Sequence, residues 1–212
     1  MKELRYTLIS DGSSDSAFLP ILDWLLIHDL GIGYAIQGKW ADLRKLPNPP
    51  KSLSEKIPTT LDLYPCDLLF IHRDAENESR QKRLDEIHKA VKLANISNFP
   101  VVSVIPIKMM EACLLFDQPA IRKAAGNPNS KCQITLPSLN NVEELSDPKS
   151  ELLTILVNAS KRKGRRLKNF KERQAVQRLA EIIDDYSPLN RLSAFQALKT
   201  DLAETIKNQG WL

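Results

Sequence analysis

Short apolar runs alternate with helix-like segments through the first two-thirds of the chain, and this alternation limits the possible folds more than any other feature. Residues 4–10 and 67–72 have the β-branched and aromatic content of strands, and residues 101–107 form a further apolar run. Pro106 confines the hydrogen bonding of that last run to one side or to its end. Strands that alternate with helices in this way are typical of βαβ units and a mostly parallel sheet. The sequence therefore predicts an α/β fold.

The segments between these runs supply the remaining elements of the core. A helix is expected to begin near Ser14, and a second helix is expected over residues 79–93, because apolar side chains recur there at helical spacing. Residues 34–40 are expected to form another strand. Consecutive prolines place a loop at residues 46–50, since they forbid the continuation of a helix.

The pattern changes after Asp117. Residues 127–138 are polar and interrupted by prolines, so we expect them to leave the core as an excursion. This change predicts an α/β core over residues 1–117, followed by residues 118–212 as an insertion and a helical C-terminal region packed on that core. The late helices are expected over residues 149–161, 171–184 and 192–208.

Composition excludes several classes of protein. The apolar fraction of 42% and the charged fraction of 26% are those of an ordinary globular protein. No apolar run approaches the roughly 20 residues that span a bilayer, and the first residues lack the cleavage pattern of a signal peptide. The three cysteines are scattered, which disfavours a zinc knuckle and favours reduced thiols in the cytoplasm. A net charge of +4 permits nucleic-acid binding without requiring it, and self-association is left open.

Acidic residues follow three of the predicted strands. Functional groups of parallel α/β sheets collect where the strands end, so we expect these carboxylates to converge. Carboxylates placed together repel one another unless a positive charge lies among them, and hard oxygen ligands suit Mg²⁺ or Mn²⁺. A metal ion held there would activate water for attack on a phosphate. The acids are Asp11 and Asp15 after residues 4–10, Asp74 and Glu76 after residues 67–72, and Glu111 and Asp117 after residues 101–107.

Each acid also has a structural interpretation. Residues 11–14 suit a turn and a helix N-cap, which are frequent uses of Asp, Gly and Ser. Asp74 could begin a loop or cap a helix, and Glu111 on a short helix could be solvated. The joint placement of the acids after three strand candidates is what favours a metal site.

Two of these segments resemble the motifs of the TOPRIM family, which topoisomerases, DnaG-type primases and old-family nucleases share. The first family motif is Glu-Gly-x-x-Asp, and residues 11–15 (DGSSD) are similar to it with Asp in place of Glu. The second is Asp-x-Asp, and the matching residues 72–74 (HRD) have His72 in place of the first acid. The resemblance implies a Rossmann-like TOPRIM core. It assigns catalysis to Asp11, Asp15 and Asp74, and ligation of Mg²⁺ or Mn²⁺ to Asp11 and Asp74. The placement of the strand ends adds Glu111 to the expected metal ligands, and Glu76 could compensate for the acid that His72 replaces.

Most of the chain is also similar to a group of small bacterial TOPRIM-like proteins of poorly defined function, the DUF4276 group. The matching segments are residues 72–77 (HRDAEN), 106–117 (PIKMMEACLLFD) and 187–198 (SPLNRLSAFQAL). Members of this group are found beside ATPase genes in anti-phage defence loci. The resemblance therefore implies an effector that works with an ABC- or SMC-like ATPase subunit.

Basic residues concentrate in residues 161–173 (KRKGRRLKNFKER), where Glu172 is the single acid. Such density is typical of a contact with the phosphate backbone of nucleic acid. Gly164 and Asn169 are expected to interrupt helical structure and leave a basic loop between two helices. A solvated turn, or a surface for an acidic partner, is the alternative. The residues expected to bind nucleic acid are Lys161, Arg162, Lys163, Arg165, Arg166 and Lys168.

Three functions are compatible with these features. The leading hypothesis is a metal-dependent nuclease that hydrolyses DNA or RNA, with Asp11 or Asp15 as base or ligand. The second is a catalytically inactive regulator of an ATPase, which His72 and the apolar faces of the late helices favour. The third is a phosphatase or phosphotransferase with Asp11 as nucleophile, which the lack of a Gly-rich phosphate loop disfavours.

Overall fold

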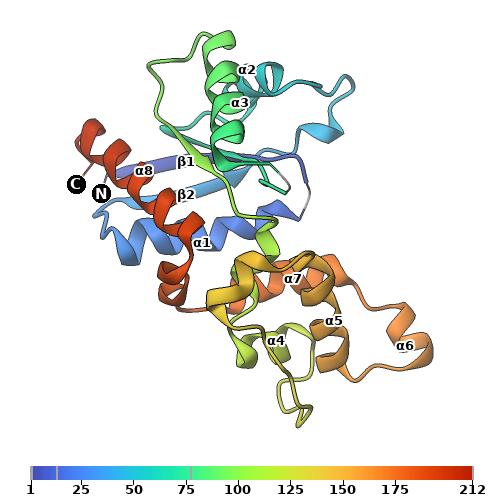
Figure 1. The fold of residues 1–212 in the computed structure, drawn as a ribbon. Coiled ribbons are helices and arrows are strands. Elements are labelled where there is room, and N and C mark those ends of the chain that lie inside the picture. Colours follow the sequence, from blue (N-terminus) through green and yellow to red (C-terminus); the bar gives the residue numbers. More distant parts are fainter. Residues whose placement is uncertain (1, 13, 77, 212) are drawn as a thin grey trace.

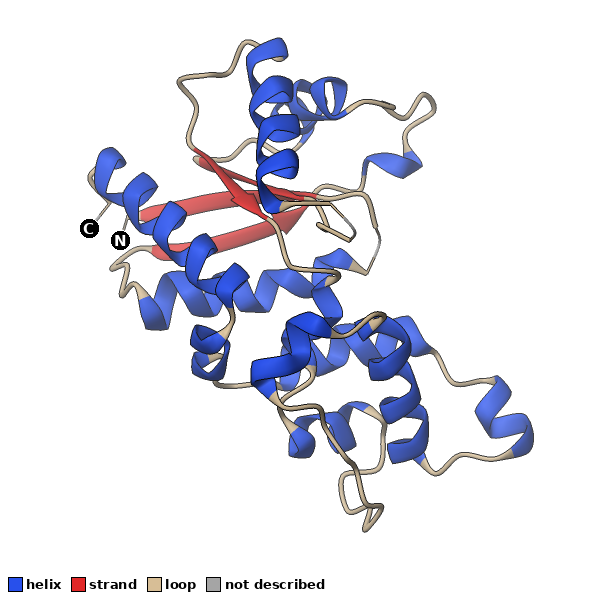
Figure 2. Cartoon of the chain, viewed as in Figure 1, coloured by secondary structure: helices blue, strands red, loops and turns tan. Residues whose placement is uncertain are grey.

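A four-stranded parallel sheet lies at the centre of the computed structural model, which describes residues 2–12, 14–76 and 78–211. Figure 1 shows the course of the chain, and Figure 2 shows the strands in red between layers of helices. The strand order is β2-β1-β3-β4, and the predicted α/β fold with a parallel sheet is confirmed. Ser13, within residues 11–15 (DGSSD), and Asn77, within residues 72–77 (HRDAEN), lie outside the described residues. The strands are β1 (Glu3–Ile9), β2 (Ala35–Trp40), β3 (Leu68–His72) and β4 (Val101–Val104).

The two central strands explain why this sheet needs cover on both faces. Tyr6 and Leu8 of β1 face one apolar layer, whereas Ile9 and Ile71 face the other. Every residue of β3 is buried, as expected for a parallel strand with helices on both sides.

The helices on the two faces belong to different connections between strands. The first face carries α1, from the connection between β1 and β2, together with α8; the second face carries α2 and α3, from the later connections. The strand order therefore reverses between β1 and β3, and the crevice at such a reversal is where open α/β sheets bind ligands. These helices are α1 (Phe18–Trp24), α2 (Leu53–Leu63), α3 (Arg80–Leu93) and α8 (Ser193–Gln209).

A helical region follows β4 and lies beside the sheet (Figure 1). Its helices α4, α5 and α7 pack on one another, and their apolar side chains join the same cluster as the first face of the sheet. Over the described residues, no helix combines the length and apolar character that crossing a membrane requires. The elements are η4 (Met110–Leu114), α4 (Gln118–Ala124), η5 (Leu139–Glu144), α5 (Pro148–Ser160), α6 (Gly164–Lys168), α7 (Glu172–Ile182) and η6 (Ser187–Arg191).

The structure corrects several predicted boundaries near the sheet. The strand expected over residues 101–107 ends at Val104, because beyond it the carbonyl of Pro106 accepts a hydrogen bond from the Ala75 amide (3.1 Å) outside the sheet. The helix expected from Ser14 begins with the 3₁₀ turn η1 (Asp15–Ala17) and ends in the π-helical turn η2 (Leu25–Asp29). A 3₁₀ turn, η3 (Leu43–Lys45), follows β2.

Other corrections concern helices. The basic loop expected between the late helices contains α6, and Gly164 begins this helix, with φ of 53°, instead of breaking one. Two further helices have no counterpart among the predicted elements. One is α2, which begins with a capping box formed by Ser52 and Glu55, and the other is α4, which Asp117 caps. The helices predicted over residues 149–161, 171–184 and 192–208 are confirmed as α5, α7 and α8.

Tyr6 fixes the sheet against α1 and restricts β2. Its hydroxyl lies 2.8 Å from Oδ1 of Asp23 and 3.1 Å from the carbonyl oxygen of Leu19. Its ring covers Gly38 of β2, where an added Cβ would lie 2.4 Å from the ring and from the hydroxyl. Only glycine therefore fits at this position of the strand while Tyr6 stays in place.

Candidate functional site

A polar cleft of about 330 Å³ lies at the carboxyl ends of β1, β3 and β4. Acids and bases both line it, and they come from the strand ends and from the first turns of α3 and α5. The cleft is thus placed at the reversal of strand order, where the topology predicts a ligand site. Its lining side chains are Asp11, Gly12, Ser14, Asp15, His72, Arg73, Asp74, Glu76, Arg83, Met109, Glu111 and Lys149.

His72 joins two carboxylates at the base of the cleft. Its Nε2 lies 3.2 Å from Oδ1 of Asp74, and its Nδ1 lies 3.3 Å from Oδ2 of Asp15, the latter an ion-pair contact without hydrogen-bond alignment. Burial disfavours the charged imidazolium, but the interactions with Asp15 and Asp74 outweigh burial and raise the pKa of His72 to about 9. His72 therefore carries a positive charge between two negative ones at neutral pH.

Asp15 is the anionic partner that stays ionised despite its burial. Burial favours the neutral acid, but His72 and the hydrogen bond from the Gly12 amide (2.8 Å) lower the pKa of Asp15 to about 2. Gly12 lies in the turn after β1 and Asp15 begins η1, so this hydrogen bond joins the two. Asp15 thus stabilises the turn as well as the imidazolium.

Asp11 lies at the mouth of the cleft and is held by two cations. Its carboxylate accepts a hydrogen bond of 2.6 Å from Nζ of Lys56 on α2, and another from the guanidinium of Arg73. Its side chain is 53% exposed, so it stays accessible to solvent.

Arg73 and Arg83 connect the cleft to α3. Arg83 donates to both carboxylate oxygens of Glu86, at 3.1 and 3.0 Å, and to the carbonyl of Asp74 at 3.0 Å. Arg73 lies 3.4 Å from the same Glu86 carboxylate, and Arg83 lies 3.9 Å from Glu76. These contacts fix guanidinium groups beside the carboxylates of the strand ends.

Glu111, on η4, is a second buried acid of the cleft. Burial raises its pKa; Lys149 offsets part of this effect, and Asp74 and Asp15 raise the pKa further. The electrostatic influence of these carboxylates on Glu111 indicates that three strand ends contribute negative charge to one space.

The backbone at the rim of the cleft adopts an uncommon conformation. The segments after β3 and β4 run side by side, and the Glu76 amide donates to the Lys108 carbonyl at 3.2 Å. Both residues are left-handed, with φ of 53° for Glu76 and 64° for Lys108. Non-glycine residues in this region are uncommon and cluster at binding and catalytic sites.

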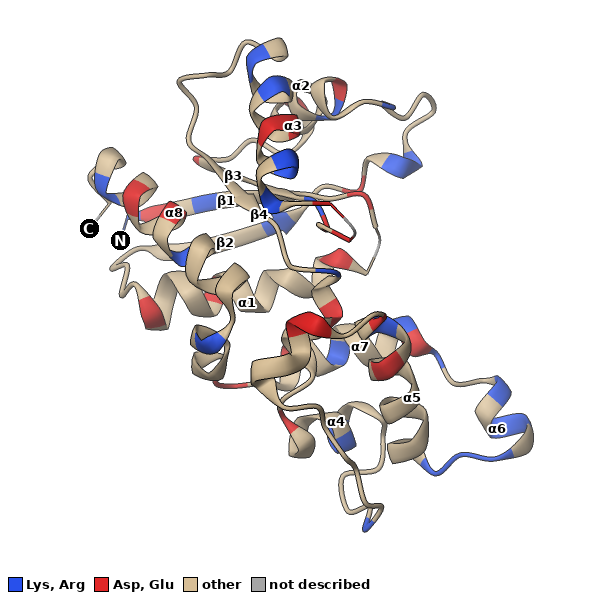
Figure 3. Ribbon diagram, viewed as in Figure 1, with Lys and Arg blue, Asp and Glu red and all other residues tan. Residues whose placement is uncertain are grey.

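The structure brings together the five acids proposed as catalytic or metal-binding residues. Asp117, the sixth acid of the predicted clusters, lies apart from the cleft, where its side chain accepts the Ala120 amide (2.9 Å) at the start of α4. The basic residues of 161–168 are also remote: they surround α6, which Figure 3 shows as a blue segment far from the sheet. The five acids in the cleft are Asp11, Asp15, Asp74, Glu76 and Glu111.

Sequence reasoning missed the cations of this site. Arg73 lies within residues 72–74, one of the motifs described above, and Arg83 lies near the start of the helix predicted over residues 79–93. Both were therefore close in sequence to Asp74, an acid already expected at the site. Lys56 and Lys149 had no such local signal, because only the packing of α2 and α5 brings them to the strand ends.

The donor set fits a hard divalent cation in its chemistry, since carboxylate oxygens predominate in the cleft. Across residues 2–12, 14–76 and 78–211, however, no three His, Cys, Asp or Glu side chains are arranged closely enough to hold a metal ion. Protein cations, above all His72, occupy the space between the acids in this conformation.

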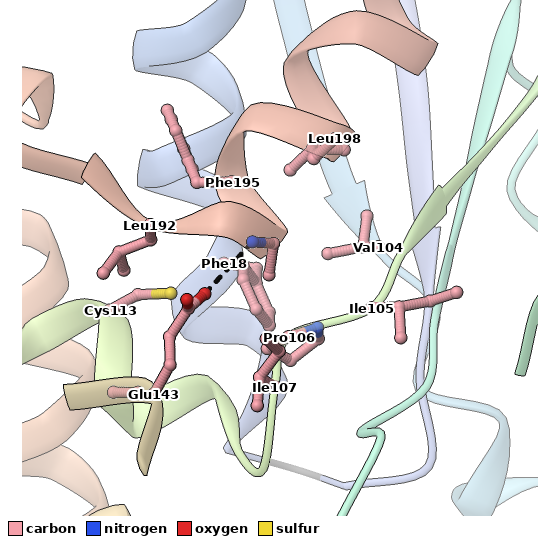
Figure 4. A pocket seen from close by; sticks show the side chains of 12 residues that line it. Phe18, Val104, Ile105, Pro106, Ile107, Cys113, Glu143, Leu192, Phe195 and Leu198 are labelled. Atoms are coloured by element: carbon pink, nitrogen blue, oxygen red, sulfur yellow. Dashed lines mark hydrogen bonds between the residues drawn. The ribbon is translucent and has the colours of Figure 1, made fainter. Parts of the chain in front are cut away.

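A second pocket, of about 20 Å³, is apolar and lies between β4, η4 and α8 (Figure 4). Glu143 reaches its edge and accepts hydrogen bonds from the amides of Ser193 (3.1 Å) and Ala194 (3.0 Å) at the start of α8. Burial raises the pKa of Cys113 in its wall to about 12, with Glu143 adding to the effect. A thiol that stays protonated is a poor nucleophile, so this pocket belongs to the packing of α8.

The fold and the cleft define this chain as an α/β protein with a four-stranded parallel sheet and a mixed acidic and basic cleft at its carboxyl edge. The sequence matches no protein-family model, no curated protein and no solved structure.

Proposed function

We propose that this chain is a TOPRIM-like, metal-dependent nuclease that hydrolyses phosphodiester bonds of DNA or RNA, and that it serves as the effector of an anti-phage defence system. One observation carries the chemical part of the proposal: acids from three strand ends share a single cleft with Arg73, Arg83 and Lys149. Acids suit a divalent cation, and fixed cations suit the phosphate that must lie beside it.

The side chains of the cleft divide into three roles under this proposal. Asp74, Glu76 and Glu111 would hold Mg²⁺ or Mn²⁺ once the acids move closer together than they are in this structure, because all three line the cleft and supply oxygen ligands. Arg83 and Lys149 bind phosphate oxygens. When bound, the metal polarises the phosphate and lowers the pKa of coordinated water.

The acids of the first motif act around this centre. Asp15 holds the His72 imidazolium and the turn after β1, which keeps Asp74 oriented through the Nε2 contact. Asp11, exposed and hydrogen-bonded to Lys56 and Arg73, accepts a proton from the attacking water.

A cleavage assay tests the proposal. Plasmid, single-stranded DNA and total tRNA are incubated with the protein and Mg²⁺ or Mn²⁺, and Asp74→Asn is compared with the wild type. Asp74→Asn keeps the shape and an acceptor for His72 while removing the charge, so we expect cleavage to fall by at least about a hundredfold. Glu78→Gln is the matched control, because Glu78 is exposed, pairs with Lys82 and lies outside the cleft. Cleavage at the wild-type rate by Asp74→Asn would contradict the proposal.

One observation favours a second candidate, a catalytically inactive regulator of an ABC- or SMC-like ATPase. His72 neutralises Asp15 and Asp74 within the protein, which leaves less need for a metal ion. Thermal denaturation with and without Mn²⁺ separates the two candidates. If the cleft is a nuclease site, the binding of Mn²⁺ should raise the melting temperature of the wild type, and it should raise that of Asp74→Asn much less. An unchanged melting temperature, together with a stable complex with the ATPase, favours the regulator.

A further inference from the structure

A second charged recess, of about 350 Å³, lies in the helical region between the end of α4, the segment around α6, and α7. Three cations line it, together with two side-chain amides and one aromatic ring. Among the residues that the structure describes, no carboxylate contributes to its walls. The lining side chains are Ala124, Arg162, Asn169, Phe170, Lys171, Gln174, Ala175 and Arg178.

The geometry of α7 brings two of the cations to the same wall. Gln174 and Arg178 stand at positions i and i+4 and share one face of α7, and Lys171, the residue directly before the helix, lines the same recess. The acids of this helix are directed elsewhere: Glu172 lines a different pocket, beside α5, and Glu181 accepts a hydrogen bond from Gln177.

Arg162 supplies the third cation from the opposite side. Its guanidinium packs over the Phe170 ring, 5.3 Å from the centroid, and this contact restricts the side chain before any ligand binds. Lys161 ends α5 in a left-handed conformation (φ 54°), which turns the chain at this point. Arg162 is thereby brought close to α4, where an added Cβ at Gly126 would lie 3.5 Å from its Nη2.

The cations of the recess differ from most other basic residues in their ionic contacts. Within the described ranges, Arg162, Lys171 and Arg178 form none of the ion pairs with carboxylates that occupy most other arginines near the sheet. Like charges placed around one hollow repel one another, so the recess gains stability when an anion enters it. Guanidinium and ammonium groups with amide donors beside them match the oxygens of a phosphate.

We propose that this recess binds a phosphate group of a nucleic-acid backbone, held by Arg162, Lys171 and Arg178. The contact is independent of cleavage in the acidic cleft and would serve the inactive regulator equally well. It also relocates the nucleic-acid contact that the sequence places over residues 161–168: Arg162 belongs to the recess, whereas Arg165, Arg166 and Lys168 of α6 are exposed and lie outside its walls.

Fluorescence anisotropy with labelled single-stranded DNA and RNA, in EDTA so that no metal-dependent cleavage occurs, tests this site. Arg162→Gln/Arg178→Gln is expected to weaken binding at least tenfold. The slope of log affinity against log salt should become shallower by about 0.7, since the variant loses one single-strand phosphate contact and each such contact contributes about 0.7. Lys89→Gln/Lys92→Gln on α3 is the matched control, with the same change in net charge at exposed positions, and it should bind within about twofold of the wild type.

Three outcomes would overturn the proposal. Equal losses in the recess variant and the α3 variant would show that affinity follows net charge alone. A larger loss in Arg165→Gln/Arg166→Gln would transfer the contact to the outer side of α6. Displacement of the probe by AMP or inorganic phosphate at concentrations similar to the oligonucleotide's would assign the recess to a small anion. Arg178→Gln alone removes no hydrogen bond or ring contact described above. A loss of affinity in this variant would therefore report on binding and not on folding.

Discussion

His72 stands where the TOPRIM motif that residues 72–74 resemble has an acid, and in this structure the histidine has contacts that an acid could not make. A carboxylate at this position would face Asp15 and Asp74 across distances near 3 Å, whereas an imidazolium pairs with both. The contribution of His72 and Asp15 to the stability of the folded protein depends on pH in two ranges. A pKa raised to about 9 means that the contribution of His72 to stability is present below about pH 6.5 and lost as pH rises through 9. A pKa of Asp15 lowered to about 2 means that its contribution is present above about pH 4 and lost as pH falls through 2.

We therefore predict a bell-shaped dependence for His72→Gln. The difference in free energy of unfolding between the wild type and this variant should be largest between about pH 4 and 6.5, on the order of 2 kcal/mol, and should shrink toward both extremes. Urea denaturation at a series of pH values measures it. A difference that stays constant from pH 4 to 10 would mean that His72 is neutral in the folded protein.

The acids of the cleft could be predicted from the sequence, whereas the positions of Lys56 and Lys149 could not. Asp11, Asp74 and Glu111 follow strands, and parallel strands end at one edge, so local pattern suffices to bring them together. Lys149 reaches the cleft from the first turn of α5, whose position depends on contacts with η4 and α7 far away in sequence. No local pattern encodes such a position.

At the scale of single elements, α8 shows how a helix is fixed by a residue outside it. Its N-cap residue, Leu192, forms no side-chain capping hydrogen bond, and Glu143 of η5 takes that role. The Ser193 hydroxyl adds a third hydrogen bond to the same carboxylate, at 2.9 Å. A negative charge at a helix N-terminus is also favoured by the helix dipole.

Glu143→Ala should accordingly lower the free energy of unfolding by about 1–2 kcal/mol, the usual cost of losing a helix cap. Chemical denaturation followed by circular dichroism measures the change. Glu144→Ala is the control, since Glu144 is exposed and one residue away. Equal effects from the two variants would contradict the capping role.

Predictability also differs between elements. The sequence pattern located β1 and β3 because they are short apolar runs, and the three late helices because each buries an apolar face. It missed α4, whose seven residues are too few to establish a period, and it misread Gly164, which tolerates the left-handed start of α6. Short helices depend on caps and neighbours more than on their own periodicity.

At the scale of the whole molecule, the sheet and the helical region share one apolar interior. Leu198, Leu202 and Ile206 of α8 lie in the same cluster as Tyr6 and Val102 of the sheet. Ser16 beside β1 also donates a hydrogen bond to Gln177 on α7 at 2.9 Å. The first face of the sheet is thus covered by the last helix of the chain.

A fragment of residues 1–117 should therefore fail to fold cooperatively, because the loss of α8 exposes the first face of the sheet to water. Thermal denaturation by circular dichroism, compared with the full chain, checks this. A sharp transition in the fragment near the melting temperature of the full chain would show that the residues before α4 are sufficient.

The contact between Tyr6 and Gly38 has a consequence for how this sequence can diverge. The Tyr6 side chain fills the volume that a Cβ at position 38 would need, so Gly38 cannot be enlarged while Tyr6 stays in place. In relatives of this chain, a larger residue at the position of Gly38 should occur only where the position of Tyr6 holds a small side chain. The hydrogen bond from that position to α1 would then be absent, and the acid at the position of Asp23 would lose the partner that keeps it there. Substitutions at these three positions should accordingly be inherited as a group, even though β1, α1 and β2 are separate in sequence.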